Sequence, residues 1–426
     1  MNNFRADVLA AIVLIAAISV GCQQEETSSG AAPSLVRIEP GADAARRIQE
    51  ALIQAQPGDT IELAAGRYDF TSTLSLDVRD VTVRGQGHDK TLLTFTGQRQ
   101  GTGGEGVSIT SDGVEIRDLA IEDTQGDALK INGAEDIVVR NVRTEWTGEP
   151  QETNGAYGIY PVMCRRVLVE GCIARGASDA GIYVGQSEDV VVRRNSAKEN
   201  VAGIEIENCT RADVYDNDIT GNTGGILVFS LPNLPAGNGS VCRVFDNRVS
   251  DNNHRNFAPQ GNIVGMVPPG TGIMIMAYDQ VEVFDNTIAN NQTVNLAILS
   301  YLVTEKQFDD SDYDPYCEAI HVHDNRFEGG GDEPQGKLGT VLGALLGGQF
   351  PDIAYDGLND PAKVTDGQLS ESLRISIHDN GDADFANLDL ENFEPPLKWP
   401  TVSRDADPYA SPLEPLAPVI WEGLAQ

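Results

Sequence analysis

The sequence is short of positive charge. It contains 30 lysines and arginines against 64 aspartates and glutamates in 426 residues, which gives a formal net charge of −34 at pH 7. A surface this acidic repels nucleic acid, and it repels any other polyanion that is bound without a bridging cation. We therefore expect no nucleic-acid partner, and calcium is the natural bridge to an acidic polymer.

Apolar runs long enough to cross a membrane are also missing. The stretch Val8 to Val20 follows Arg5 and is too short to span a bilayer, which is typical of a secretory signal peptide. The residues Ser19-Val20-Gly21-Cys22 resemble a bacterial lipobox, in which the cysteine becomes the lipidated N-terminus. We predict a signal peptide over residues 1–21 and lipidation of Cys22; an ordinary cleaved signal peptide is the alternative.

The residues after Cys22 predict where the protein works. Residues 22–36 are rich in Gln, Glu and Ser, a composition that favours a flexible linker. We expect a protein of the cell envelope, lipid-anchored on the periplasmic face or in the outer membrane. The lipid anchor is then its only contact with the membrane.

Cysteines are few and odd in number. Five remain when Cys22 is set aside, and three of them, Cys164, Cys209 and Cys317, share one position in the repeat described below. Cys164 and Cys209 are two repeats apart, or about 9.6 Å if strands stack at about 4.8 Å, which is beyond disulfide reach. We expect buried free thiols rather than a disulfide framework.

A short repeat dominates the rest of the chain. Apolar residues stand three positions before and two positions after a recurring asparagine, as in Val214, Asn217 and Ile219. Gly-Ile pairs at residues 158, 181, 203 and 225 are 23, 22 and 22 residues apart. Period-two β patterns repeated at this interval, with Asn and Gly turns, predict a parallel β-helix, a coil of short strands stacked on its neighbours.

The recurring asparagines predict two internal ladders. Stacked one per coil, their side chains can hydrogen-bond along the helix axis, and Asn tolerates the left-handed conformation of turns. The first row is Asn195, Asn217, Asn247, Asn286, Asn325 and Asn380, and the second is Asn200, Asn222, Asn252 and Asn291. We assign both rows a structural role.

The N-terminal part of the repeat region predicts a cap. Asp43 to Ala55 has apolar residues at helical spacing, and a helix there would cover the open end of the solenoid. The following Gln56 to Leu63, with Gly66-Arg67-Tyr68, resembles the opening of pectate-lyase-like and chondroitinase-B-like proteins. That resemblance implies an all-β, right-handed parallel β-helix with an N-terminal capping helix, in the superfamily of carbohydrate-binding and sugar-hydrolase repeats.

A narrower resemblance covers roughly residues 36–330. The segments Ala177 to Ser187, Gly203 to Asn208 and Asn253 to Phe257 are similar to those of a family of exported parallel β-helix repeat lipoproteins. This resemblance implies fold and location rather than a reaction. The expected organisation is an N-terminal cap with the first coils over residues 37–97, the β-helix with its loop insertions over 98–330, and an irregular far-end cap over 331–426, where tryptophans 399 and 421 act as packing anchors.

One row of outward positions offers a ligand surface. In the Gly-Ile-x-Ile strands we expect the x residue to face solvent, and successive coils place Lys130, Tyr160, Tyr183, Glu205, Leu227 and Met274 in that row. Tyr rings can stack on sugars, and Lys130 with Glu205 can bind hydroxyls or carboxylates. The same groups could remove the proton beside a uronate carboxylate. The alternative is that the tyrosines only stiffen the sheet.

Loop insertions offer further candidates. Insertions interrupt the coils at residues 233–240, 252–271 and 301–315. The second carries His254 and Arg255, a possible base and anion clamp, and the third carries Asp310, Asp312 and Asp314, hard oxygen ligands suited to calcium. A merely solvated acidic loop is the alternative.

The remaining histidines and methionines suggest softer metals. His321 and His323 are two apart on a predicted strand and share a face, but zinc needs more nearby ligands than these two. The chain also resembles the periplasmic β-helix proteins of nitrous-oxide reductase maturation, and this resemblance implies a copper site. Its available ligands are Met266, Met274, Met276 and His254.

Two functions are consistent with these patterns. The first is a noncatalytic, tethered β-helix that binds a polysaccharide of the cell envelope or scaffolds a partner protein. The second is a calcium-assisted polysaccharide lyase or C5-epimerase acting on an acidic glycan. The Asp-Pro-His-Asp run of the alginate epimerases is absent from the sequence, which favours the first.

Overall fold

The computed structural model describes residues 32–99, 104–365, 368–393 and 398–421. Residues 33–426 form one compact unit, and the predicted signal peptide and Cys22 lie outside the described residues. In the described ranges no helix has the length and apolar character needed to cross a membrane.

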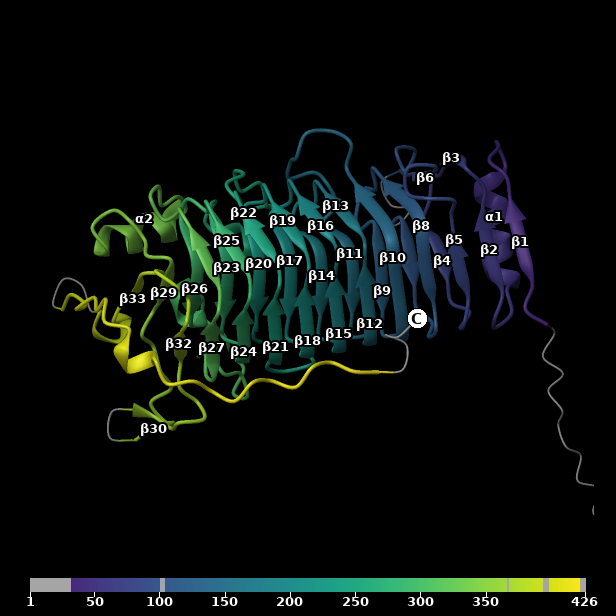
Figure 1. Cartoon of the computed structure of the whole chain (residues 1–426). Helices are drawn as coiled ribbons and strands as arrows, with labels where there is room; N and C mark the ends of the chain where they lie inside the picture. Colours follow the sequence, from purple (N-terminus) through teal and green to yellow (C-terminus); the bar gives the residue numbers. More distant parts are fainter. Residues whose placement is uncertain (1–31, 100–103, 366–367, 394–397, 422–426) are drawn as a thin grey trace, which may run out of the picture. The chain divides into compact units, whose positions relative to one another are not determined.

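Parallel strands in two long sheets make up most of this unit (Figure 1). Within the described residues, the larger sheet contains β1 Leu35–Ile38, β2 Thr60–Leu63, β3 Gly66–Asp69, β5 Thr82–Arg84, β6 Thr91–Thr94, β8 Glu115–Glu122, β10 Glu135–Glu145, β12 Arg165–Glu170, β13 Ile173–Arg175, β15 Glu188–Arg193, β16 Ser196–Lys198, β18 Thr210–Tyr215, β19 Asp218–Thr220, β21 Ser240–Phe245, β22 Arg248–Ser250, β24 Asp279–Phe284, β25 Thr287–Ala289, β27 Ile320–His323, β28 Arg326–Glu328 and β32 Ser376–His378. We call it sheet A.

The second sheet, sheet B, carries the Gly-Ile-x-Ile strands. Its described members are β4 Leu74–Leu76, β7 Val107–Ile109, β9 Leu129–Asn132, β11 Tyr157–Val162, β14 Ala180–Gly185, β17 Ala202–Glu207, β20 Gly224–Phe229, β23 Thr271–Met276, β26 Val294–Leu299, β29 Ile353–Tyr355 and β33 Phe385–Asn387. A small antiparallel pair, β30 Val364–Thr365 and β31 Gln368–Leu369, lies apart from both.

The strand register confirms the predicted repeat. Each strand pairs in parallel with the equivalent strand one coil later, so that Val192 stands beside Val214 and Ile182 beside Ile204. The inward apolar positions form one continuous core, in which all four of these side chains are fully buried. The five cysteines after the N-terminal segment are free and buried, as predicted.

Both asparagine ladders form as predicted. Along the first row each Asn side-chain amide donates to the carbonyl oxygen of the next Asn, at 2.9–3.0 Å from Asn195 to Asn380. The second row shows the same contacts at 3.0–3.1 Å. The left-handed backbone falls on the residue before the Asn, as at Asp216 and Asp324, where φ is 55° and 53°. The Asn side chains therefore satisfy buried turn groups rather than supply the turn conformation.

The N-terminal helix covers the first coil. Helix α1, Ala44–Gln54, buries Ala44, Ile48 and Leu52 against the start of the solenoid core, as its helical spacing predicted. A second helix, α2 Gly336–Leu345, follows the last full coil. Four 3₁₀ turns complete the regular structure of the described residues: η1 Ile263–Met266, η2 Tyr301–Thr304, η3 Leu390–Asn392 and η4 Asp407–Tyr409.

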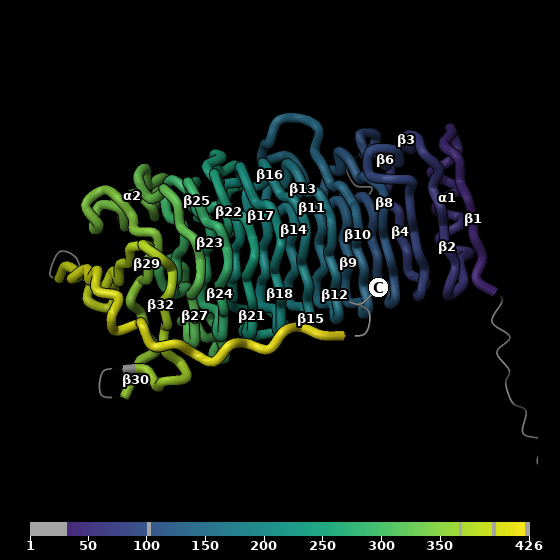
Figure 2. The backbone as a smooth tube through the Cα atoms, viewed as in Figure 1, coloured from purple at the N-terminus to yellow at the C-terminus, as the bar shows by residue number. Residues whose placement is uncertain are grey.

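The C-terminal region differs from the predicted irregular far-end cap. Strands β29, β32 and β33 continue the two sheets beyond residue 330. The chain then turns back and runs along the outside of sheet A (Figure 2, yellow). There Val419 packs on Leu168 and Val191, with Trp421 beside them, so Trp421 is an anchor on the side of the solenoid. Trp399 is 62% exposed, so it does not serve as a buried anchor.

Candidate functional site

The predicted row on sheet B exists, but most of it is not open to solvent. Lys130 pairs with Tyr160, and Tyr183 pairs with Glu205, on adjacent strands. Tyr183 is 4% exposed and Glu205 is 1% exposed, and Leu227 and Met274 are buried as well. Solvent exposure was therefore a wrong prediction for these four residues. The cause is the 252–271 insertion, which folds over the row and forms a second apolar cluster with it through Phe257, Val264 and Val267.

Lys130 and Tyr160 remain half-buried at the edge of the insertion. The Lys130 ammonium lies 3.6 Å from Glu105 and 3.8 Å from Asp127, and 5.3 Å from the centre of the Tyr160 ring. The rings of Tyr157, Tyr160 and Tyr183 form a group, with centroids 4.4–5.0 Å apart. The edge thus combines aromatic faces with a lysine that already has anionic neighbours.

Three carboxyl groups lie beneath the same insertion. The Tyr183 hydroxyl donates to Glu207 at 2.5 Å, and the Asn262 amide of the insertion donates to Asp179 at 3.1 Å. Burial raises the pKa of Asp179 and of Glu207 to about 7, and raises the pKa of Glu205 well above its usual range. One oxygen of Glu205 has no hydrogen-bond partner among the described residues. Asp179 and Glu207 can therefore gain or lose a proton near neutral pH.

His254 and Arg255 hold the insertion in place rather than join this group. The His254 ring packs edge-on against Phe257, and the Arg255 guanidinium donates to the carbonyl oxygen of Pro150 at 2.7 Å. The predicted roles as base and anion clamp therefore have no geometry to support them. Three residues of the proposed copper set, Met266, Met274 and Met276, line a small apolar cavity whose lining does not include His254.

The predicted calcium ligands do not converge. Asp310 accepts hydrogen bonds from the main chain of Asn233 and Asp312, while Asp314 forms an ion pair with Lys363. Within the described ranges the three carboxylates form no group close enough to share an ion. The alternate carboxylates of this loop shape its turns, and calcium binding by them stays a prediction. Asp314 instead joins Asp279 and Glu318, and Lys363 forms ion pairs with Asp314 and Glu318 of this group.

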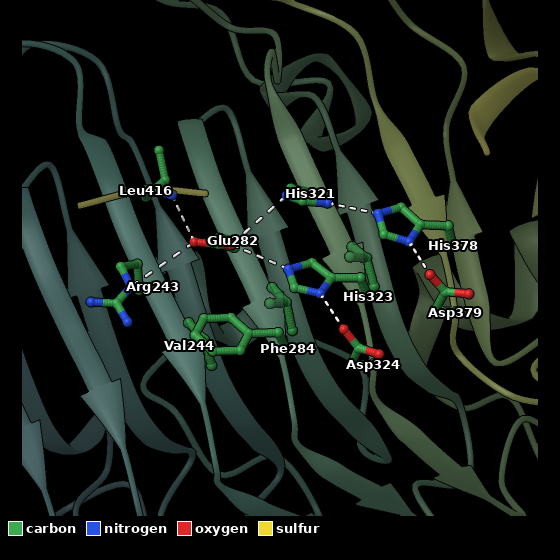
Figure 3. Close-up of polar contacts among 12 residues, drawn as sticks. Arg243, Val244, Glu282, Phe284, His321, His323, Asp324, His378, Asp379 and Leu416 are labelled. Atoms are coloured by element: carbon green, nitrogen blue, oxygen red, sulfur yellow. Dashed lines mark hydrogen bonds and ion pairs between the residues drawn. The ribbon is translucent and has the colours of Figure 1, made fainter. Parts of the chain in front are cut away.

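A second cluster of chemically capable groups lies on the outer face of sheet A (Figure 3). Glu282 on β24 pairs in register with His321 on β27, and His323 pairs with His378 on β32. Strand alternation sends all four side chains outward. The C-terminal segment covers them, so the side chains of Glu282 and His321 are only 3% and 6% exposed.

Each group of this cluster has defined neighbours. Glu282 Oε1 lies 3.2 Å from His323 Nε2 and 3.8 Å from His321 Nδ1, while its Oε2 accepts from the Leu416 amide at 2.9 Å. His321 Nε2 and His378 Nε2 are 2.8 Å apart. Burial, with the neighbouring His323 and His378, lowers the pKa of His321 to about 4, so this ring is neutral at pH 7.

The sequence alone showed only two zinc ligands, His321 and His323. The register of the asparagine ladder identifies the residues that lie beside them. Glu282 and His321 both stand four positions before a ladder Asn, at 286 and 325. His323 and His378 both stand two positions before one, at 325 and 380. Alignment of the coils on the ladder would have placed the four side chains together.

Comparisons with known proteins give one family model and several similar solved structures. Residues 93–239 match the family model described as right handed beta helix region. A search of curated proteins found no match. Among solved structures, the Azotobacter vinelandii mannuronan C-5 epimerase AlgE4 A-module has 15% identity, a TM-score of 0.49 and coverage of 74% of this chain and 87% of its own.

Two further solved structures are similar at the same level. Pectate lyase Pel9A has 12% identity, a TM-score of 0.44 and coverage of 71% of this chain and 78% of its own. The catalytic unit of an α-1,3-glucanase from Streptomyces thermodiastaticus has 15% identity, a TM-score of 0.47 and coverage of 76% and 51%. Residues 93–239 are a right-handed β-helix region, and the parallel pairing in both sheets shows that the described chain is a right-handed parallel β-helix.

Proposed function

We propose that this protein is an exported, lipid-anchored β-helix that binds a polysaccharide of the cell envelope without cleaving it. The observation that carries the proposal is the open strip of sheet B. Ser75, Ser108, Lys130 and Tyr160 stand on successive strands, exposed or half-buried, and end at the covering insertion. Three strand intervals of about 4.8 Å give the strip a length of about 14 Å.

The chemistry of the strip favours an uncharged glycan. The Tyr160 ring offers a face for stacking on a sugar, and the two serines and Lys130 offer hydrogen bonds to hydroxyls. Glu105 and Asp127 stand within 4 Å of the Lys130 ammonium, so they oppose the approach of a uronate carboxylate. If no glycan binds, we infer instead that the protein acts as a scaffold for a partner protein.

The described geometry supports binding rather than catalysis. Burial raises the pKa of Asp179 and of Glu207 to about 7, which suits acid–base chemistry, but both side chains are at most 7% exposed beneath the insertion. A polymer chain that rests on the strip reaches Tyr160 and stops at the wall that the insertion forms. The binding function therefore needs no movement of the protein.

A lyase or C5-epimerase, aided by calcium, is the second candidate, because the Tyr183 hydroxyl and Glu207 form an acid–base pair. A base would remove the C5 proton of a uronate. In a lyase the C4 oxygen then leaves with a proton from an acid, and in an epimerase a proton returns to C5 from the opposite face. Either reaction requires the insertion to open.

A glycan array with the purified protein, with and without calcium, tests the proposal. We expect binding of a neutral glycan that weakens about tenfold, or about 1.4 kcal/mol, in Tyr160→Ala. Tyr215→Ala is the matched control, because this half-buried tyrosine lies on sheet A. Ultraviolet absorbance from unsaturated product would show a lyase, and altered uronate composition would show an epimerase. Unchanged binding in Tyr160→Ala contradicts the proposed strip.

The export and anchor are tested separately. Labelling of cells with a radioactive fatty acid should mark the wild-type protein and leave Cys22→Ser unlabelled. A Cys22→Ser protein that still carries lipid contradicts the predicted anchor.

A further inference from the structure

We propose that Glu282, His321 and His323 form a binding site for a divalent first-row transition cation of the zinc type. The site lies on the outer face of sheet A and does not depend on the glycan strip of sheet B. Each residue offers one ligand atom, and these atoms all lie within 4.8 Å of one another. The ring nitrogens that face Glu282 Oε1 are His321 Nδ1 and His323 Nε2.

The spacing of these atoms suits a metal ion. Zn–N and Zn–O bonds of about 2.0–2.1 Å in a tetrahedral site place neighbouring ligand atoms about 3.4 Å apart. Glu282 Oε1 lies 3.2 Å from His323 Nε2 and 3.8 Å from His321 Nδ1. Small side-chain rotations that move these atoms by a few tenths of an ångström would bring both pairs to the tetrahedral spacing.

Among the residues that the structure describes, the buried atom His321 Nδ1 has no hydrogen-bond partner. The residue is 5% exposed, and an unpartnered polar atom at that depth costs about 1–3 kcal/mol. A metal ion bonded to this nitrogen would remove that cost. This observation is independent of the clustering of the three ligands and points to the same place.

The hydrogen bonds of the histidine rings show which ring nitrogen carries the proton and which has a lone pair. His323 Nδ1 lies 2.8 Å from Asp324, which accepts only, so this nitrogen carries the proton. By the same argument His378 Nδ1 donates to Asp379 at 2.8 Å, and its Nε2 then accepts from His321 Nε2. With the ring protons on these atoms, His321 Nδ1 and His323 Nε2 are the ring nitrogens that face Glu282.

Such an arrangement needs a cation. Two imidazole lone pairs and a carboxylate oxygen repel one another at 3–4 Å unless a proton or a metal ion stands between them. The neighbours described above fix the far side of each ligand, as the outer partners of metal-binding histidines do (Figure 3). Glu282 is fixed in the same way, because the Leu416 amide binds its other oxygen.

The donor set selects the type of ion. Two imidazoles with one carboxylate suit zinc, iron(II) and related ions, whereas calcium and magnesium prefer oxygen ligands. His321 also lines a cavity of about 510 Å³ between the C-terminal segment and the sheet, together with Arg374 and Pro415. Three protein ligands beside a cavity leave a coordination position for water or a small anion.

Calorimetric titration of the EDTA-treated full protein with Zn²⁺ tests the proposal, and Co²⁺ absorption in the visible range reports the geometry. We expect one ion per chain and tetrahedral cobalt bands, with affinity reduced at least 100-fold in Glu282→Gln and in His321→Ala. Asp324→Asn should lose 10–100-fold, because it acts only through His323. His88→Ala, on the N-terminal coils, is the control and should bind as the wild type does.

Several results would overturn the proposal. No zinc binding by the wild type would mean that a proton bridges His323 and Glu282 as an ion pair. Equal binding by the wild type and Glu282→Gln would place the ion elsewhere. Circular dichroism of each variant separates loss of the site from loss of the fold. If His321→Ala does not fold, Glu282→Gln and Asp324→Asn, which keep the shape of the side chains, decide the question.

Discussion

Single residues beneath the 252–271 insertion link the stability of the protein to pH. The pKa of Glu207 is raised by burial to about 7 in the folded state, against about 4.5 for an exposed glutamate. Between these two values the folded protein holds more protons than the unfolded chain. The free energy of unfolding therefore falls as pH rises from about 4.5 to about 7, and the buried Asp179 contributes in the same direction.

Glu207→Gln should remove part of this dependence. The amide keeps an oxygen to accept from the Tyr183 hydroxyl but cannot ionise. We expect the variant to be more stable than the wild type at pH 8, on the order of 1–3 kcal/mol, and similar at pH 4.5. Urea unfolding at both pH values measures this. Glu152→Gln, at an exposed position, is the control, and equal pH slopes in Glu207→Gln and the wild type would contradict the prediction.

The residues of the candidate sites were predictable in position but not in environment. Lys130, Tyr160, Tyr183 and Glu205 do form one row, because strand alternation is a local property. Their exposure depends on where an insertion from residues far along the chain folds, and no periodicity encodes that. The sequence analysis did not bring Glu282 and His378 together with His321 and His323, although their positions relative to the ladder asparagines could be read. The register of this cluster was present in the ladder positions, but His378 lies beyond the part of the repeat that is easy to read.

At the scale of elements, the C-terminal segment acts as a cover for sheet A. Its main-chain amides at Leu416 and Val419 donate to Glu282 and to Asp213, at 2.9 and 3.1 Å, and Val419 is 7% exposed. Two buried carboxylates in the middle of a sheet face thereby gain main-chain hydrogen bonds, beside the contacts that Arg243 makes with Asp213 and His323 makes with Glu282. Up to residue 421, where the description ends, the segment adds no strand to sheet A or to sheet B.

Removal of residues 411–426 should destabilise the protein without unfolding the solenoid. The loss of two hydrogen bonds to carboxylates and of the Val419 contact is worth on the order of 3–6 kcal/mol. We expect a lower melting temperature with an unchanged β-sheet circular dichroism spectrum. Val419→Ala should show a smaller effect of the same sign, and Ile420→Ala, which is 79% exposed, should show none. A truncated protein without β structure would contradict the assignment of the segment as a cover.

The elements themselves were predicted with uneven success. The capping helix and the coils up to β28 follow from short-range spacing, because each coil repeats the same turn chemistry. Beyond residue 330 the strands β29, β32 and β33 are separated by long connections, so the interval that identifies a coil is lost. The turning back of the C-terminal segment rests on contacts more than a hundred residues apart in sequence, such as Leu416 with Glu282.

At the scale of the whole molecule, the two proposed sites are carried by different sheets of one solenoid. The glycan strip belongs to sheet B and the metal cluster to sheet A, and the buried core lies between their inward positions. Each coil contacts only its neighbours, so a change at one site is expected to remain local. Zinc titration should consequently leave glycan affinity unchanged.

The net charge of −34 acts on every ligand that approaches this molecule. An acidic glycan is repelled over about 30 Å at an ionic strength of about 0.01 M, but only over about 8 Å at about 0.15 M. We therefore expect binding of an acidic glycan to strengthen as NaCl rises through this range or as calcium is added, while binding of a neutral glycan stays constant. Titrations of matched neutral and uronate oligosaccharides measure the difference. An acidic ligand that binds best at the lowest salt would show that the strip presents a local positive field, and Lys130 would then be free of the two carboxylates that flank it.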